Sequence, residues 1–127
     1  MDSLDKYIKD RYKDETFVKM MFRLMKERDL TSSDICKRAN IDHKYFSKLN
    51  TNPDYKPSKK NVCALAIALH LDNATAKQLI KKAGYILTSA SKLDLVLRFC
   101  FENEIYDIHK INELLYDQGL TTLYISY

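Results

Sequence analysis

The sequence contains few of the residues that tight turns require. Its 127 residues include only two glycines and two prolines. A sheet protein needs many turns, and turns depend on residues that adopt positive φ or fix φ. The scarcity of both residue types therefore predicts helices joined by few tight turns. It also excludes a glycine-rich phosphate loop, because only glycine lets the backbone approach a phosphate so closely.

The number and spacing of the cysteines argue against two common structural roles. Cys36, Cys63 and Cys100 lie far apart and form no C-x-x-C pair. An odd number of well-separated cysteines is typical neither of a disulfide framework nor of a zinc knuckle. We expect three small buried thiols in a reducing cytoplasm. We predict no bound metal and no cofactor.

Long apolar segments are missing, which bears on where the protein resides. No stretch approaches the ~20 apolar residues that span a bilayer. The first five residues are acidic and contain no apolar run, so we expect no signal peptide. The chain is nevertheless 46% hydrophobic, enough for one core. The sequence predicts a cytoplasmic protein of one domain, without a membrane partner.

Charge is present in quantity and is unevenly distributed. The net charge is +4, but residues 35–60 carry seven basic residues against two acidic ones, or +5. Residues 99–118 carry five acidic residues against one lysine, or −4. A basic middle and an acidic end suggest different partners for the two segments. The alternative is that both are ordinary solvated helix faces.

The spacing of apolar residues predicts an all-α fold in three parts. An amphipathic helix is expected within 1–13, a core of helices within 14–84, and a helical pair within 85–127. The helix that begins at Phe17 is apolar almost all round, which is typical of a central core helix. The residues expected to open the later helices are Ser58, Asp72 or Asn73, Ser91 with Asp94, and Asp107.

Two short helices are predicted in the basic middle, at about 32–39 and 43–50. Thr31 followed by Asp34 reads as a capping box for the first of them. Asn40 ends that helix, because asparagine tolerates the left-handed conformation. Apolar or small residues occupy the positions where two crossing helices must touch: these are Ile35, Cys36, Ile41, Phe46 and Leu49.

The outward positions of the second short helix are polar and partly basic. They are His43, Lys44, Ser47 and Lys48. Side chains of this kind on an exposed helix face are the ones that reach base edges in a major groove. The alternative is that they are plain surface residues.

The segments LTSSDICKRANIDHKYFSKLN and KPSKKNVCALAIALHLD resemble the helix-turn-helix of the Cro/phage-repressor (XRE-like) family, over about residues 17–71. The resemblance implies a five-helix core, here with an N-terminal helix and a C-terminal helical pair added. It also implies base contacts from His43, Lys44, Ser47 and Lys48. The DNA-backbone contacts that it implies are Ser32, Lys37, Arg38, Lys56, Lys59 and Lys60.

The chain departs from the family pattern at a few positions. Asparagine stands at Asn40 where the family often has glycine, and serine stands at Ser32 where it usually has glutamine. The loop at 50–57 is longer than is common there. The segment LIKKAGYILTSASKLDLVLRFCFENEIYDIHKINELL is similar to one that follows helix-turn-helix modules at the ends of larger bacterial proteins.

Three functions compete on this basis. The first is a DNA-binding transcription regulator from a bacterium or phage, acting as a homodimer through its C-terminal helices or the apolar tail. The second is a protein-binding adaptor or small inhibitor with the same fold. The third, an enzyme, is disfavoured because His43, His70 and His109 are scattered and show no metal-ligand spacing. Tyr45 and Tyr55 are further candidates for stacking or phosphate contact.

Overall fold

A computed structural model describes residues 2–52 and 54–123, and these residues form eight helices and no strand. The predicted all-α class is therefore confirmed for the described chain. In order, the helices are α1 (Asp2–Arg11), α2 (Phe17–Glu27), α3 (Ser32–Ala39), α4 (His43–Thr51), α5 (Lys59–Ala68), α6 (Asn73–Lys82), α7 (Lys92–Glu102) and α8 (Ile108–Asp117).

Local capping explains where these helices begin and end. In α3, Asp34 N–H donates to Thr31 Oγ1 at 3.2 Å, and Thr31 N–H donates to the Asp34 carboxylate at 2.8 Å. Asn40 adopts the left-handed conformation after α3, with φ of 55°. The predicted capping box and helix stop are both confirmed. Side-chain oxygens cap all the helices from α2 to α8: those of Thr16, Thr31, Asp42, Ser58, Asp72, Ser91 and Asp107.

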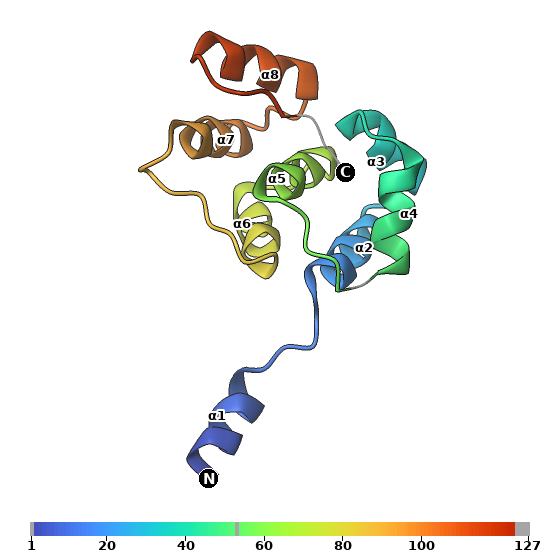
Figure 1. Ribbon diagram of the computed structural model, residues 1–127, viewed down its shortest axis with the longest axis vertical. Coiled ribbons are helices and arrows are strands. Elements are labelled where there is room, and N and C mark those ends of the chain that lie inside the picture. The colour runs from blue at the N-terminus through green and yellow to red at the C-terminus, as the bar shows by residue number, and fades with distance from the viewer. Residues whose placement is uncertain (1, 53, 124–127) are drawn as a thin grey trace.

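One hydrophobic core unites the helices from α2 to α8. Helix α5 lies at its centre in Figure 1 and packs against α3, α6 and α8. Every residue from 61 to 69 is buried, because neighbours surround α5 on all sides. Helix α2 buries six residues, as expected for a core helix. The three cysteines are buried and free, which confirms the expectation of buried thiols.

The C-terminal helices are fastened to this core by polar contacts as well as by packing. The Lys59 ammonium donates to the Asp94 carboxylate at 2.7 Å, joining α5 to α7. Tyr85 Oη donates to the carbonyl of Pro57 at 3.0 Å. Tyr106 Oη donates to the carbonyl of Leu71 at 2.7 Å. The predicted core 14–84 and the described part of the predicted extension 85–127 thus share one hydrophobic core.

Helix α1 stands away from the rest of the molecule (Figure 1). The side chains described in it, from residue 3 to residue 11, are all exposed. Its apolar residues contribute nothing to the core and face solvent: Leu4 is 61% exposed, Tyr7 57% and Ile8 49%. At the other end of the chain, Leu123 is buried, whereas the rest of the predicted apolar tail, 124–127, lies outside the described residues.

Among the described helices, none combines the length and the apolar character that crossing a membrane requires.

Candidate nucleic-acid interface

Helix α4 has two chemically different faces. Tyr45, Phe46 and Leu49 are buried against the core. The four residues proposed to contact bases are all exposed on the other face: His43, Lys44, Ser47 and Lys48. Because residues three and four apart share one side of a helix, the four form one continuous polar strip. The structure therefore brings these sequence-predicted residues together.

The start of α3 adjoins this strip. Ser32, His43, Ser47 and Asn50 line a shallow hollow of about 200 Å³ between α3 and α4. The floor of the hollow is apolar: the rings of Phe22 and Phe46 meet edge to face, with centroids 5.6 Å apart. Ser32, expected to contact phosphate, thus lies beside two of the residues expected to contact bases.

Two tyrosines, Tyr45 within α4 and Tyr55 after it, make aromatic contacts at this helix. The Lys48 ammonium lies over the Tyr55 ring, 4.6 Å from its centroid. Tyr45 meets Tyr55 edge to face, and its hydroxyl accepts a hydrogen bond from Asn61 Nδ2 at 3.3 Å. Burial raises the pKa of Tyr45. The suggestion that Tyr45 contacts phosphate is wrong, because its side chain is wholly inside the protein.

The residues expected to contact the DNA backbone do not all lie in one place. Lys37 and Arg38 line a separate hollow of about 350 Å³ together with His70, Tyr106 and His109. The Arg38 guanidinium also donates to the carbonyl of Ala68 at 3.1 Å, at the end of α5. This second hollow lies between the C-terminal part of α3 and the start of α8. It is distinct from the hollow that holds Ser32.

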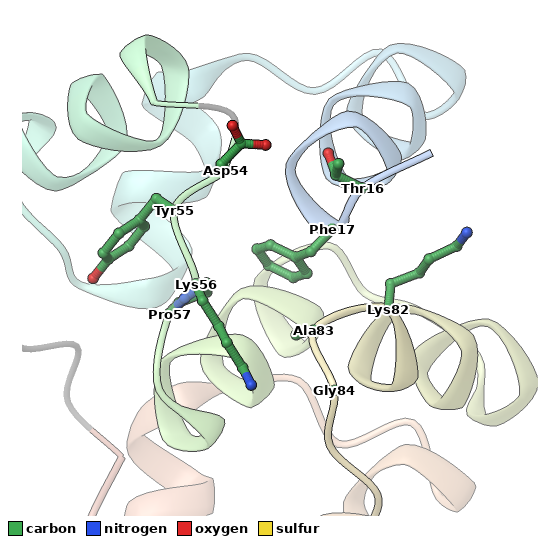
Figure 2. Close-up of a pocket in the computed structure, with 9 residues that line it drawn as sticks. All are labelled: Thr16, Phe17, Asp54, Tyr55, Lys56, Pro57, Lys82, Ala83 and Gly84. Atoms are coloured by element: carbon green, nitrogen blue, oxygen red, sulfur yellow. The ribbon is translucent and has the colours of Figure 1, made fainter. Parts of the chain in front are cut away.

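Lys56 lies in a third hollow, of about 350 Å³, between the loop before α5 and the end of α6. Figure 2 shows Lys56 extending from this loop toward Gly84, while Lys82 points away on the other side of Phe17. The Lys56 ammonium is 5.2 Å from the centroid of the Tyr85 ring. Lys56 is exposed, so it remains available to a ligand that reaches this side of the molecule.

The two lysines at the start of α5 differ from each other. Lys59 is committed to an internal ion pair with Asp94 and its side chain is 31% exposed. Lys60 is half-buried. An ammonium held at 2.7 Å by a buried carboxylate has little capacity for a phosphate. Lys59 is therefore less available to a phosphate than the exposed lysines of this segment.

His70 is held by an aromatic stack. Its ring lies parallel to that of Tyr106, with centroids 4.7 Å apart, and its backbone adopts a φ of 54°. Burial, and to a lesser extent the Arg38 charge, lower the pKa of His70. The structure thus favours neutral His70, in contrast to the cation that suits the end of a helix.

This pKa shift predicts a dependence of stability on pH. Because the pKa of folded His70 lies below its ordinary value of 6.5, the unfolded chain takes up a proton first as pH falls. His70→Asn removes the titration and tolerates the positive φ. We expect wild type to lose stability relative to His70→Asn between about pH 7.5 and pH 5.5. Urea unfolding of both proteins across this range measures the difference, and a constant difference would contradict the assignment.

The described residues contain no group of three or more metal-ligating side chains that could hold an ion. Comparison of the chain with family models, curated proteins and solved structures found no match. The fold and the candidate site therefore define only a class of protein. In the part of the chain that the structure describes, it is all-helical and exposes a basic helix face beside the start of a neighbouring helix.

Sequence reasoning missed the tertiary partners of several polar residues. The Asp94 backbone N–H donates to Ser91 Oγ at 3.2 Å, so Ser91 opens α7 as expected. The Asp94 carboxylate, however, accepts from Lys59 and from the backbone N–H of Thr88 at 2.8 Å. A lysine 35 positions away gives no signal in the local pattern. The only sign in the sequence was an acidic residue in the first turn of α7.

Proposed function

We propose that the protein binds double-stranded DNA by inserting α4 into the major groove, and that it acts as a transcription regulator. The observation that carries the proposal is the continuous exposed strip of His43, Lys44, Ser47 and Lys48, backed by a buried face. The resemblance of residues 17–71 to the Cro/phage-repressor helix-turn-helix gives this strip the role of the base-reading face. The basic segment at 35–60 supports the same interpretation.

The chemistry of the strip suits a nucleic-acid ligand. The width of the major groove admits one α-helix, and lysine, serine and histidine donate hydrogen bonds to base edges there. Ser32 lies in the first turn of α3, where backbone N–H groups favour a phosphate. A phosphate at Ser32 would fix the register of α4, because the two border the same hollow.

Titration of labelled mixed-sequence duplex DNA, followed by fluorescence anisotropy at several salt concentrations, tests this proposal. We expect wild type to bind at low salt and to weaken steeply as salt rises. Lys44→Ala/Lys48→Ala should bind at least about tenfold more weakly and lower the log–log salt slope by roughly 2. Lys77→Ala/Lys81→Ala removes two exposed lysines at the same spacing from α6 and is the matched control.

The proposal fails if wild type does not bind at low salt, or if the α4 and α6 double variants lose the same affinity. Equal losses would show a general dependence on positive charge rather than an interface on α4. Circular dichroism of the three proteins verifies that each is folded.

A second candidate function is a protein-binding adaptor or small inhibitor. It is favoured by an exposed apolar surface on α7, at Leu95 and Phe99. Binding to a protein partner that persists at high salt, without DNA binding, would support it. Under either function we propose no enzymatic activity.

A further inference from the structure

We propose that the hollow between the C-terminal part of α3 and the start of α8, which we call the α3–α8 hollow, binds a small aromatic anion such as a phosphate or carboxylate attached to a ring. Its volume of about 350 Å³ lies at the lower end of the range for small-molecule sites, about 300–1,000 Å³. The inference is independent of DNA binding, because none of the described residues that line this hollow belongs to α4.

Two neighbouring basic side chains bring positive charge to the hollow. Lys37 and Arg38 lie in the last turn of α3, and both line it. The Arg38 guanidinium donates to the carbonyl of Ala68 at 3.1 Å, which holds this side chain in place. Because a guanidinium carries five N–H donors, one hydrogen bond to a carbonyl leaves it able to bind an anion as well. Lys37 is exposed and adds a second charge.

The fold also brings two of the three histidines of the sequence to this hollow. His70 follows α5 and His109 lies in the first turn of α8, so they come from distant segments. Both residues are exposed. An imidazole donates at least one N–H to an anionic oxygen whether it is charged or neutral. The third histidine, His43, lines the separate hollow beside α4.

One carboxylate lines the hollow too, and it is engaged by helix α8. Asp107 caps this helix and accepts a hydrogen bond from the backbone N–H of His109 at 2.9 Å. The partial positive charge at the start of a helix offsets the charge of a carboxylate there. With Lys37 and Arg38 set against Asp107, the lining keeps an excess of positive charge.

The rest of the lining is apolar or aromatic, and this decides the class of anion. Ile108 is buried and Tyr106 is half-buried. The Tyr106 ring stacks on His70 with centroids 4.7 Å apart, and its hydroxyl donates to the carbonyl of Leu71 at 2.7 Å. A wall that is already fixed lowers the ordering cost of binding. Since small-ligand sites combine apolar lining with a few polar groups, an aromatic anion fits better than inorganic phosphate.

Titration of the full chain with phenyl phosphate, followed by NMR of the imidazole signals, tests the proposal. We expect His70 and His109 to shift together with one Kd, on the order of 1 mM. His43 should not shift, because it lines a different hollow. Inorganic phosphate lacks the ring and should bind at least about threefold more weakly. Phenol lacks the charge and should give no saturable shift.

Lys37→Ala and Lys110→Ala form a matched pair of variants. Lys37→Ala removes a charge that lines the hollow and should raise the Kd for phenyl phosphate about tenfold. Lys110 is exposed beside His109 but is not among the described residues that line the hollow. Because salt screens charges outside the hollow, Lys110→Ala should keep the wild-type Kd within about twofold. Both lysines are exposed, so both variants should fold normally.

Three results would overturn the proposal. The first is the absence of a saturable shift of His70 and His109 at about 10 mM phenyl phosphate. The second is an equal loss of affinity in the two lysine variants, which would show a general attraction to positive charge. The third is a shift of both histidines with duplex DNA but not with phenyl phosphate, which would favour the DNA-backbone role that the family resemblance implies for Lys37 and Arg38.

Discussion

Replacement of Asp94 by alanine should lower the free energy of unfolding by about 3 kcal/mol. The Asp94 side chain is 2% exposed and accepts hydrogen bonds from the Lys59 ammonium and from the Thr88 backbone N–H. Removal of the carboxylate leaves a half-buried ammonium and a backbone N–H without their acceptor. Urea denaturation followed by circular dichroism measures the loss.

Asp94→Asn is the matched control for this change. Its amide oxygen can still accept from Thr88, while the ionic contact with Lys59 is lost. We therefore expect a smaller loss than for alanine. An alanine variant as stable as wild type would show that the Lys59–Asp94 contact does not fasten α7 to α5.

Leu49→Ala should cost about 3 kcal/mol of stability and should also weaken DNA binding. Leu49 is completely buried and holds α4 on the core, directly behind the exposed strip. A cavity there loosens the helix that the proposal places in the major groove. Urea denaturation gives the first effect, and anisotropy at a temperature where the variant is fully folded gives the second.

Asn50→Ala alters the next residue, which is exposed, and we expect its stability to stay within about 0.5 kcal/mol of wild type. Leu49→Ala could lose stability and still bind DNA with wild-type affinity. That result would show that the packing of α4 on the core does not affect DNA binding.

Local features of the fold could be predicted closely because they depend on neighbouring residues. Helices α3 and α4 were expected at 32–39 and 43–50 and are found at Ser32–Ala39 and His43–Thr51. Thr31, Asp34 and Asn40 act within one turn of their own positions. The same holds for the exposed strip of α4, because the period of a single helix decides which of its residues face outward.

Features that depend on distant parts of the chain could not be predicted in this way. From the sequence alone Lys59 is expected to be a surface lysine, but in the structure it forms an ion pair with Asp94. Tyr45 is likewise expected at the surface, but in the structure its hydroxyl accepts a hydrogen bond from Asn61 inside the core. Lys37 and Lys56 lie in the same basic segment but in separate hollows. A charge count along the sequence cannot separate such residues, because their grouping is set by how α3, α5 and α6 pack.

We propose that DNA binds at the exposed face of α4, and backbone amide chemical shifts during titration with duplex DNA report where it binds. We predict that the shifts concentrate at Ser32, His43, Lys44, Ser47 and Lys48, with little change in α7 and α8. Shifts confined to α7 and α8, or a spectrum unchanged by DNA at low salt, would contradict the claim.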